Sequence, residues 1–216
     1  MALSAMAEPP SDCELCPRLL AYRQKNRKKE PDWFNAPVPS FGSGSARLLI
    51  VGLAPGVSGA NRTGRPFTGD YAGDLLYATL LKFGFASGTY AARIDDGLKL
   101  RNCRISNAVR CVPPENKPTP EEANTCRTFL KATLETMQDL KVVIALGRIA
   151  HESTLRAMNL KLSGFPFAHA AEHGLPRDLT LIDSYHCSRY NTNTRRLTTE
   201  MFETVFARAR KLTATA

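Results

Sequence analysis

Short apolar runs and longer amphipathic stretches alternate along most of the chain. The runs from Arg47 to Val51 and from Lys141 to Leu146 have the length and continuous apolar character of buried parallel strands. Two further strands are expected from Cys103 to Val109 and from Leu179 to Asp183. Helices are expected at residues 19–30, 71–83, from 120, 147–158 and from 198. Strands and helices alternating in this way predict an α/β fold, a three-layer α/β/α sandwich around a central, mainly parallel four-stranded sheet.

The loops after the predicted strands are where chemistry is expected. In such folds, ligands bind in the crevice outside the carboxyl ends of the strands. The segment from Gly52 to Gly69 carries five glycines and two prolines in 18 residues. It is too long for a simple connection, and long structured loops tend to be functional. With 216 residues, the whole chain (1–216) is expected to form one domain around this site.

Composition narrows the class of protein. Hydrophobic residues make up 43% and charged residues 23%, which excludes a disordered chain. No run approaches the ~20 apolar residues that span a bilayer, and no signal peptide is visible, so a cytoplasmic protein is expected. Lys and Arg number 29 against 20 Asp and Glu, a net charge of +9. This excess favours nucleic acid as a partner, although basic proteins without such a partner are common.

The cysteines indicate a metal centre. Six cysteines in a chain without an export signal are not expected to form a disulfide framework. Cys13 and Cys16 form a C-x-x-C pair, and Cys111 and Cys126 flank a proline-rich turn and a helix start. Four thiolates suit either tetrahedral zinc or a [4Fe–4S] cluster, and spacing alone does not choose between them.

Three separated motifs carry a family resemblance. They read GLAPGVSGANRTGRPFTGD at 52–70, SNAVRCVPPENKPTPEEANTC at 106–126 and SYHCSRYNTNTRRLT at 184–198. Their order, with the cysteine pair near the start, resembles the uracil-DNA glycosylase superfamily, and most closely its family 5, or type B, iron–sulfur branch. Family 4 enzymes have an acidic residue after the first glycine of the loop, where this chain has Leu53.

The resemblance implies an activity. It implies a DNA base-excision repair enzyme that hydrolyses the N-glycosidic bond of uracil, and of other deaminated bases, and leaves an abasic site. We expect it to act as a monomer on duplex or single-stranded DNA in the nucleoid. The alternative is a non-catalytic module that binds damaged DNA or RNA and is stiffened by a Cys₄ metal site.

Two residues are the catalytic candidates. Asp70 precedes an amphipathic helix, where an aspartate usually caps the helix. The resemblance implies that its carboxylate also stabilises the oxocarbenium-like sugar or orients the attacking water. A lone histidine such as His186 is more often structural, but the resemblance implies that it donates a hydrogen bond to O2 of the leaving uracil.

Two more residues are candidates for reading the base. A glycosylase must flip the target nucleotide out of the stack and hold it by stacking and hydrogen bonds. The resemblance implies that Phe67 stacks on the base, although it could equally be a core residue. Asn107 offers a donor and an acceptor that match the N3–H and O4 edge of uracil, or it could cap a local turn.

The last motif supplies the expected contacts with DNA. A basic, partly aromatic loop suits phosphate contacts and a wedge into the gap left by a flipped base. By itself it would be only a solvated surface loop. The candidates are Arg189, Tyr190, Asn191, Arg195 and Arg196. The chain departs from the usual type B pattern at Cys187, where proline is common, and at Tyr190, where glutamine is common.

The resemblance also resolves the choice of metal. It implies a [4Fe–4S] cluster with a structural role, tying the N-terminal segment to the loop after the second strand. Cys103 and Cys187 have no place in that pattern and are expected to be unligated thiols. The expected ligands are Cys13, Cys16, Cys111 and Cys126.

Overall fold

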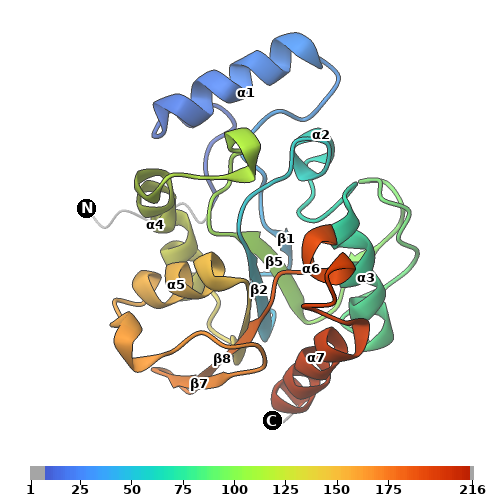
Figure 1. The fold of residues 1–216 in the computed structure, drawn as a ribbon, viewed down its shortest axis with the longest axis vertical. Coiled ribbons are helices and arrows are strands. Elements are labelled where there is room, and N and C mark those ends of the chain that lie inside the picture. The colour runs from blue at the N-terminus through green and yellow to red at the C-terminus, as the bar shows by residue number, and fades with distance from the viewer. Residues whose placement is uncertain (1–7, 215–216) are drawn as a thin grey trace.

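The fold is built on one central sheet (Figure 1). The computed structural model describes residues 8–214. The four inner strands lie in the order β5-β2-β6-β8 and are all parallel. Their bounds are β2 Leu48–Gly52, β5 Cys103–Asn107, β6 Val142–Leu146 and β8 Leu179–Ser184. The four strands expected from the apolar runs, and their parallel arrangement, are therefore confirmed.

The prediction of a four-stranded sheet was wrong in the number of strands, because two edge strands make it six. Strand β1 (Phe41–Gly42) pairs antiparallel with β5, and β7 (Glu172–Leu175) pairs antiparallel with β8. Strand β1 has only two residues, too few to show an alternating pattern of polar and apolar side chains. The Glu-His-Gly-Leu run of β7 has no continuous apolar character. A separate two-stranded sheet pairs β3 (Ala86–Ser87) with β4 (Lys99–Leu100).

Helices cover both faces of the sheet, which confirms the three-layer sandwich. Leu48 and Ile50 of β2 belong to a core cluster with residues of α3 and α7, whereas Leu49 and Val51 belong to one with residues of α4 and α5. This division follows from strand geometry, because successive side chains point to opposite faces. Figure 1 shows the two helix pairs on opposite sides of the strands. The helices are α1 Pro17–Lys29, α2 Ala60–Thr63, α3 Tyr71–Lys82, α4 Pro120–Thr136, α5 Arg148–Ala157, α6 Arg189–Asn193 and α7 Thr199–Ala214, with short 3₁₀ turns η1 Pro114–Asn116 and η2 Leu162–Gly164.

Side-chain caps begin the two longest helices. At α4, Glu122 N–H donates to Thr119 Oγ1 over 3.3 Å, and Thr119 N–H donates to Glu122 Oε2 over 2.8 Å. This reciprocal pair is a capping box, which satisfies two main-chain donors at once. At α7, Met201 N–H donates to Thr198 Oγ1 over 3.2 Å, so the predicted cap at Thr198 is confirmed.

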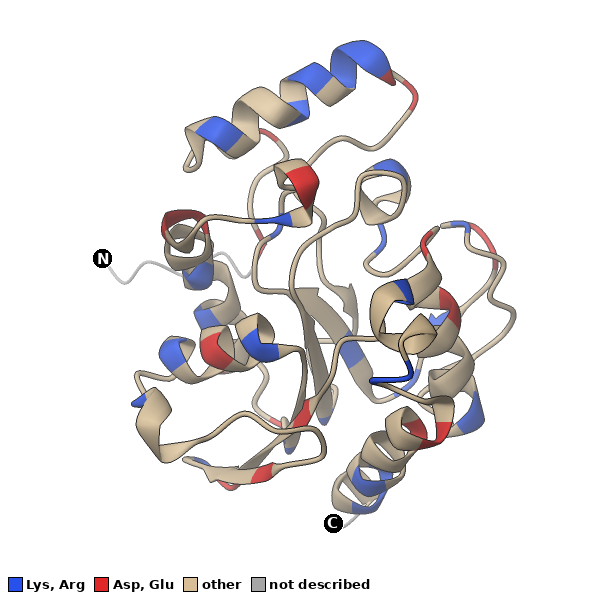
Figure 2. Ribbon diagram, in the orientation of Figure 1, with Lys and Arg blue, Asp and Glu red and all other residues tan. Residues whose placement is uncertain are grey.

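Charge is spread unevenly over the molecule. Figure 2 shows Lys and Arg along α1, at the end of the molecule where the loops after β2 and β5 also lie. Helix α1 contains no acidic residue. None of the helices within residues 8–214 is long and apolar enough to cross a membrane.

Candidate active site

One small cavity brings together the four residues that were expected to bind the base and to cleave its bond to the sugar. Asp70, His186, Phe67 and Asn107 all line a cavity of about 40 Å³, which we call the strand-end cavity. It adjoins a wider cavity of about 560 Å³, which also contacts Asp70 and His186 and extends to Arg189. Residues from three distant motifs therefore meet at the carboxyl ends of β2, β5 and β8.

Asp70 is held by the start of α3. It is the N-cap residue, and its Oδ1 accepts a hydrogen bond from Gly73 N–H over 3.1 Å. The other oxygen, Oδ2, faces Gly56 and Gly59 of the long loop: a Cβ atom built on Gly59 would lie 2.4 Å from it. Only glycine therefore lets the loop approach the carboxylate this closely. The predicted capping role is confirmed, and it leaves Oδ2 directed at the cavity side of the loop.

Burial decides the direction of the Asp70 pKa. Desolvation raises the pKa of this carboxyl above its usual value of 3.8, and the negative charge of Asp74 acts in the same direction. The hydrogen bond from Gly73 N–H lowers the pKa but is the smaller effect. The start of helix α3 favours the ionised form of the carboxyl, but burial outweighs this effect. A carboxylate with a raised pKa is a stronger base than an exposed one.

His186 follows β8 and is fixed through its main chain. Asn191 Nδ2 donates to the carbonyl oxygen of His186 over 2.8 Å. Desolvation lowers the pKa of the imidazole to about 4, so the ring is neutral at physiological pH. Its centroid lies 6.0 Å from that of Phe67, with the two rings 29° from parallel. A neutral imidazole can donate one hydrogen bond without bringing a charge into the cavity.

The side chains of Phe67 and Asn107 both pack against Gly52, which has no side chain. A Cβ atom at Gly52 would lie 2.4 Å from Asn107 Oδ1 and 2.5 Å from Phe67 Cζ, so a side chain there would displace both. Asn107 is 3% exposed, and its Oδ1 has no hydrogen-bond partner within the described residues. Buried acceptors are nearly always satisfied, so this unpartnered oxygen, on a residue that lines the strand-end cavity, is an exception. Phe67 has φ of +53°, an uncommon conformation for a bulky residue.

A buried ion pair holds the loop that carries Phe67 and Asp70, and sequence reasoning missed it. Arg65 donates to both carboxylate oxygens of Asp96, over 2.9 and 2.7 Å, and its Nε donates to Thr68 Oγ1 over 2.8 Å. Hydrogen bonds from the guanidinium hold the pKa of Asp96 well below its usual range. The position of Arg65 in the Arg-Pro-Phe-Thr run could have indicated that its side chain anchors this loop. The sequence offers no signal that Asp96 is its partner.

The four cysteines expected to bind metal lie together in an apolar setting. We call Cys13, Cys16, Cys111 and Cys126 the cysteine cage; all four pack in one hydrophobic cluster with Leu19 and Phe129. Burial and the neighbouring thiols raise the pKa of Cys16 to about 11, and burial raises that of Cys126 to about 12. Cys103 and Cys187 belong instead to the core cluster on the α3 side of the sheet.

Two N–H groups already point at sulfur atoms of the cage. Arg23 Nη1 donates to Cys111 Sγ over 3.2 Å, and Nη2 of the same guanidinium donates to the carbonyl oxygen of Cys13 over 2.9 Å. Arg110 N–H donates to Cys126 Sγ over 3.3 Å. Such donors stabilise thiolates bound to a metal. Arg23 is 1% exposed, so a buried cation lies beside the cage.

Metal-ligating side chains also cluster outside the cysteine cage. Within residues 8–214, one set of three metal-ligating groups has all its ligand atoms within 4.8 Å of one another, and it is His151, His173 and Asp183. In that set, His151 Nδ1 and His173 Nε2 bond to Asp183 over 2.7 and 3.1 Å, and His151 Nε2 bonds to Phe165 O. None of these three groups belongs to the cysteine cage.

The segment expected to touch DNA begins as a short helix rather than a loop. Ser188 caps α6 (Arg189–Asn193), and Asn191 is engaged with the backbone of His186. Arg189 lies 5.3 Å from the ring centroid of Tyr71, beside the wider cavity. Tyr190 is 72% exposed. The remaining two arginines are also exposed: Arg195, with φ of +57°, and Arg196, whose guanidinium covers the ring of Tyr185 at 4.7 Å.

Comparison with known proteins agrees with this geometry. Residues 39–210 match the family model described as the uracil DNA glycosylase superfamily. A type-5 uracil-DNA glycosylase of Thermus thermophilus is 45% identical over 98% of this chain and 99% of its own length. Those of Mycobacterium bovis and Pyrobaculum aerophilum are 41% and 37% identical, covering 94% and 92% of this chain and 78% and 88% of their own lengths. The chain therefore belongs to the uracil DNA glycosylase superfamily and, within it, to the type-5 uracil-DNA glycosylases.

Proposed function

We propose that this protein removes uracil from DNA by hydrolysing the N-glycosidic bond, as a monofunctional repair enzyme. Family membership supports the activity, and the strand-end cavity supports the assignment of residues. The observation that carries it is the unpartnered Oδ1 of Asn107 in the same cavity as Asp70 and His186. A buried acceptor without a donor is complemented by a ligand that brings one.

Uracil supplies the groups that Asn107 lacks. The N3–H group of a flipped uracil would donate to Asn107 Oδ1, and the amide nitrogen would donate to uracil O4. Phe67 would contact the face of the base, which is why its strained main chain is tolerated at this position. Recognition would then depend on hydrogen bonds in a site from which most water is excluded, where each bond discriminates most strongly.

Asp70 and His186 would share the chemical step. As the C1′–N1 bond breaks, positive charge develops on the sugar and negative charge on uracil O2. Asp70 Oδ2 would accept a proton from the attacking water, whose oxygen bonds to C1′, and its charge would stabilise the sugar. Neutral His186 would donate a hydrogen bond to O2, while the bonding electrons leave with the base.

The cysteine cage fits a [4Fe–4S] cluster better than zinc. Four thiolates, an apolar enclosure and N–H donors to Cys111 and Cys126 are the usual surroundings of such a cluster. When bound, the cluster would cross-link α1 to α4 and to the loop after β5. Base excision requires no electron, so its role would be structural.

The remaining proposals concern substrate breadth and assembly. We infer that other deaminated bases are also excised, from duplex or single-stranded DNA, by a monomeric one-domain enzyme (1–216) in the nucleoid. The exposed side chains of Arg189, Tyr190, Arg195 and Arg196 would contact the DNA. Asn191 would act indirectly, by holding the main chain of His186.

Alkaline cleavage of a labelled uracil-containing duplex tests the activity. The expected result is strand breakage at the uracil position after alkali, since alkali cleaves abasic sites. A matched duplex with thymine in place of uracil is the control. A shift in gel mobility without breakage would support the rival function, a non-catalytic module that binds damaged DNA or RNA.

A further inference from the structure

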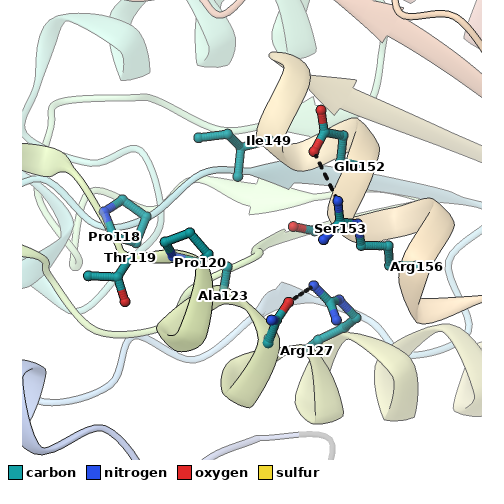
Figure 3. Close-up of a pocket in the computed structure, with 10 residues that line it drawn as sticks. Pro118, Thr119, Pro120, Ala123, Arg127, Ile149, Glu152, Ser153 and Arg156 are labelled. Carbon is teal, nitrogen blue, oxygen red and sulfur yellow. Dashed lines mark hydrogen bonds and ion pairs between the residues drawn. The ribbon is translucent and has the colours of Figure 1, made fainter. Parts of the chain in front are cut away.

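A crevice between α4 and α5, distinct from the strand-end cavity, has two arginines on one side and an apolar wall on the other (Figure 3). Its volume is about 220 Å³. Arg127 of α4 and Arg156 of α5 both extend into the space between the helices. Pro118 and Ile149 contribute to the apolar wall, and Ile149 is 43% exposed. We call this feature the α4–α5 crevice.

Arg127 is a cation whose donors are not all used. Its Nη2 donates to Asn124 Oδ1 over 2.5 Å, but its buried Nε has no partner in the described part of the chain. No carboxylate within residues 8–214 forms an ion pair with it. Burial and the nearby charge of Arg156 lower its pKa. A half-buried guanidinium that is not fully hydrogen-bonded favours the binding of an anion.

The crevice carries net positive charge. Arg156 lies 3.7 Å from Glu152, one turn earlier on α5, and both side chains are substantially exposed. Such a surface pair contributes little to stability and leaves Arg156 available to another partner. Two guanidinium groups and one carboxylate therefore face the crevice. An oxyanion between the arginines would accept hydrogen bonds from their terminal Nη groups and relieve the repulsion between their charges.

The crevice lies next to the cavity expected to bind the flipped base. Asn116 lines the wider cavity beside His186, and Pro118, two residues later, lines the crevice. Two residues of extended chain span at most ~7 Å, so one loop wall separates the two spaces. Helices α4 and α5 follow β5 and β6, so the crevice opens at the sheet edge that holds the strand-end cavity.

We propose that the α4–α5 crevice binds a sugar-phosphate unit of the DNA whose uracil occupies the strand-end cavity. The phosphate would lie between Arg127 and Arg156, and the deoxyribose would contact Ile149 and Pro118. One ligand then accounts for both the unused cation and the exposed apolar wall. This inference rests on the proposed function, because it requires DNA to be the substrate.

The test compares arginine variants on one uracil-containing duplex. Arg127→Gln and Arg156→Gln should each weaken DNA binding about five- to tenfold and reduce the slope of log affinity against log salt by about one, as expected for one lost phosphate contact. The single-turnover rate at saturating DNA should stay within about twofold. Arg127→Lys, which keeps the charge but not the fork, should bind with intermediate affinity.

Arg101→Gln is the matched control. Arg101 is exposed and precedes β5, at the opposite edge of the sheet. If Arg127→Gln binds DNA like Arg101→Gln while the wild type excises uracil, the crevice does not bind DNA and the proposed function stands. If the wild type excises no uracil, the proposed function itself fails.

A second arm locates the phosphate. Uncharged methylphosphonates placed one at a time along the duplex should weaken wild-type binding at each contacted phosphate, and at one of these positions they should have no further effect on Arg127→Gln. Inorganic phosphate at constant ionic strength tests the other source. If it binds the wild type but not Arg127→Gln, and Arg127→Gln binds DNA normally, the crevice is a free-phosphate site and the DNA assignment is overturned.

Discussion

The strand-end cavity and the cysteine cage hold their side chains by opposite means. In the cavity, the main chain does the positioning: Asp70 caps α3, and Asn191 fixes the backbone of His186. In the cage, two buried and two partly buried thiols come from segments far apart in sequence, and no disulfide joins them. A folded chain can therefore present the cavity unaided, whereas Cys16 and Cys126 of the cage, whose pKa values are raised, must lose their protons when a metal centre binds.

This difference predicts two kinds of defect. Substitutions in the strand-end cavity should change the rate of excision and leave the fold intact. Substitutions in the cysteine cage should change the fold and lower activity only as a consequence. Four measurements probe this division before the decisive one, and they follow in order of expected effect.

Cys111→Ser should produce the largest change. Serine is a poor iron ligand, so the purified protein should lose its brown colour and most of its iron. A structural metal contributes several kcal/mol, and each kcal/mol shifts the unfolding midpoint of a chain this size by about 2–4 °C, so the midpoint should fall by at least about 10 °C. Iron analysis and calorimetry of anaerobically purified protein measure both; colourless wild-type protein with one zinc would overturn the cluster assignment.

His186→Ala should slow excision by ~10²–10³-fold, the usual cost of removing one donor to a developing negative charge. Iron content and unfolding midpoint should match the wild type, because the imidazole faces the cavity and not the cage. Single-turnover kinetics on uracil duplex give the rate. Weaker DNA binding with an unchanged rate would remove His186 from the leaving-group role.

The pH dependence should identify the base. Asp70 works as the carboxylate, and burial raises its pKa above 3.8, so the rate should fall about tenfold per pH unit as the pH drops through that raised pKa. His186 has a pKa of about 4, so its imidazole stays neutral at pH values above this. The acid limb should vanish in Asp70→Asn. A limb near pH 6.5 that disappears in His186→Ala would show that the histidine is the group that titrates.

Cys187→Ser should have the smallest effect. The thiol is fully buried and donates to Ala72 O over 3.5 Å, a bond that a serine hydroxyl can also make. Its place is in the core beside α3, so iron content should not change. The unfolding midpoint should move by less than about 4 °C, which corresponds to a net loss of about 1 kcal/mol. Loss of iron in this variant would mean that Cys187 is a ligand.

Much of the fold followed from local patterns. The run Leu48–Gly52 is apolar on both faces because helices cover both faces of the sheet. Thr119 and Glu122 have the spacing of a capping box, which indicates the start of α4. Strand β7 escaped prediction because its Glu-His-Gly-Leu pattern gains its pairing only from the neighbouring β8. Helix α6 escaped because five polar and aromatic residues have no buried stripe to mark a helix.

The candidate site residues could be named from the sequence, but the residues that support them could not. Asp70, His186, Phe67 and Asn107 were named from the family resemblance together with their places at strand ends or in the long loop, and the structure places them in one cavity. The pairing of Arg65 with Asp96, 31 residues away, depends on how the chain returns, which local sequence does not encode. The same holds for the unpartnered Oδ1 of Asn107, which exists only once the cavity has formed.

Asp70→Asn tests the division of labour between the two regions most directly. One preparation should be measured for iron content, affinity for uracil duplex and single-turnover rate. The expected result is wild-type iron and affinity with a rate at least ~10²-fold lower, because one transition-state charge is removed while the cap and the cage remain. A rate within a few-fold of wild type would show that Asp70 is only a helix cap and that the strand-end cavity does not carry the chemistry.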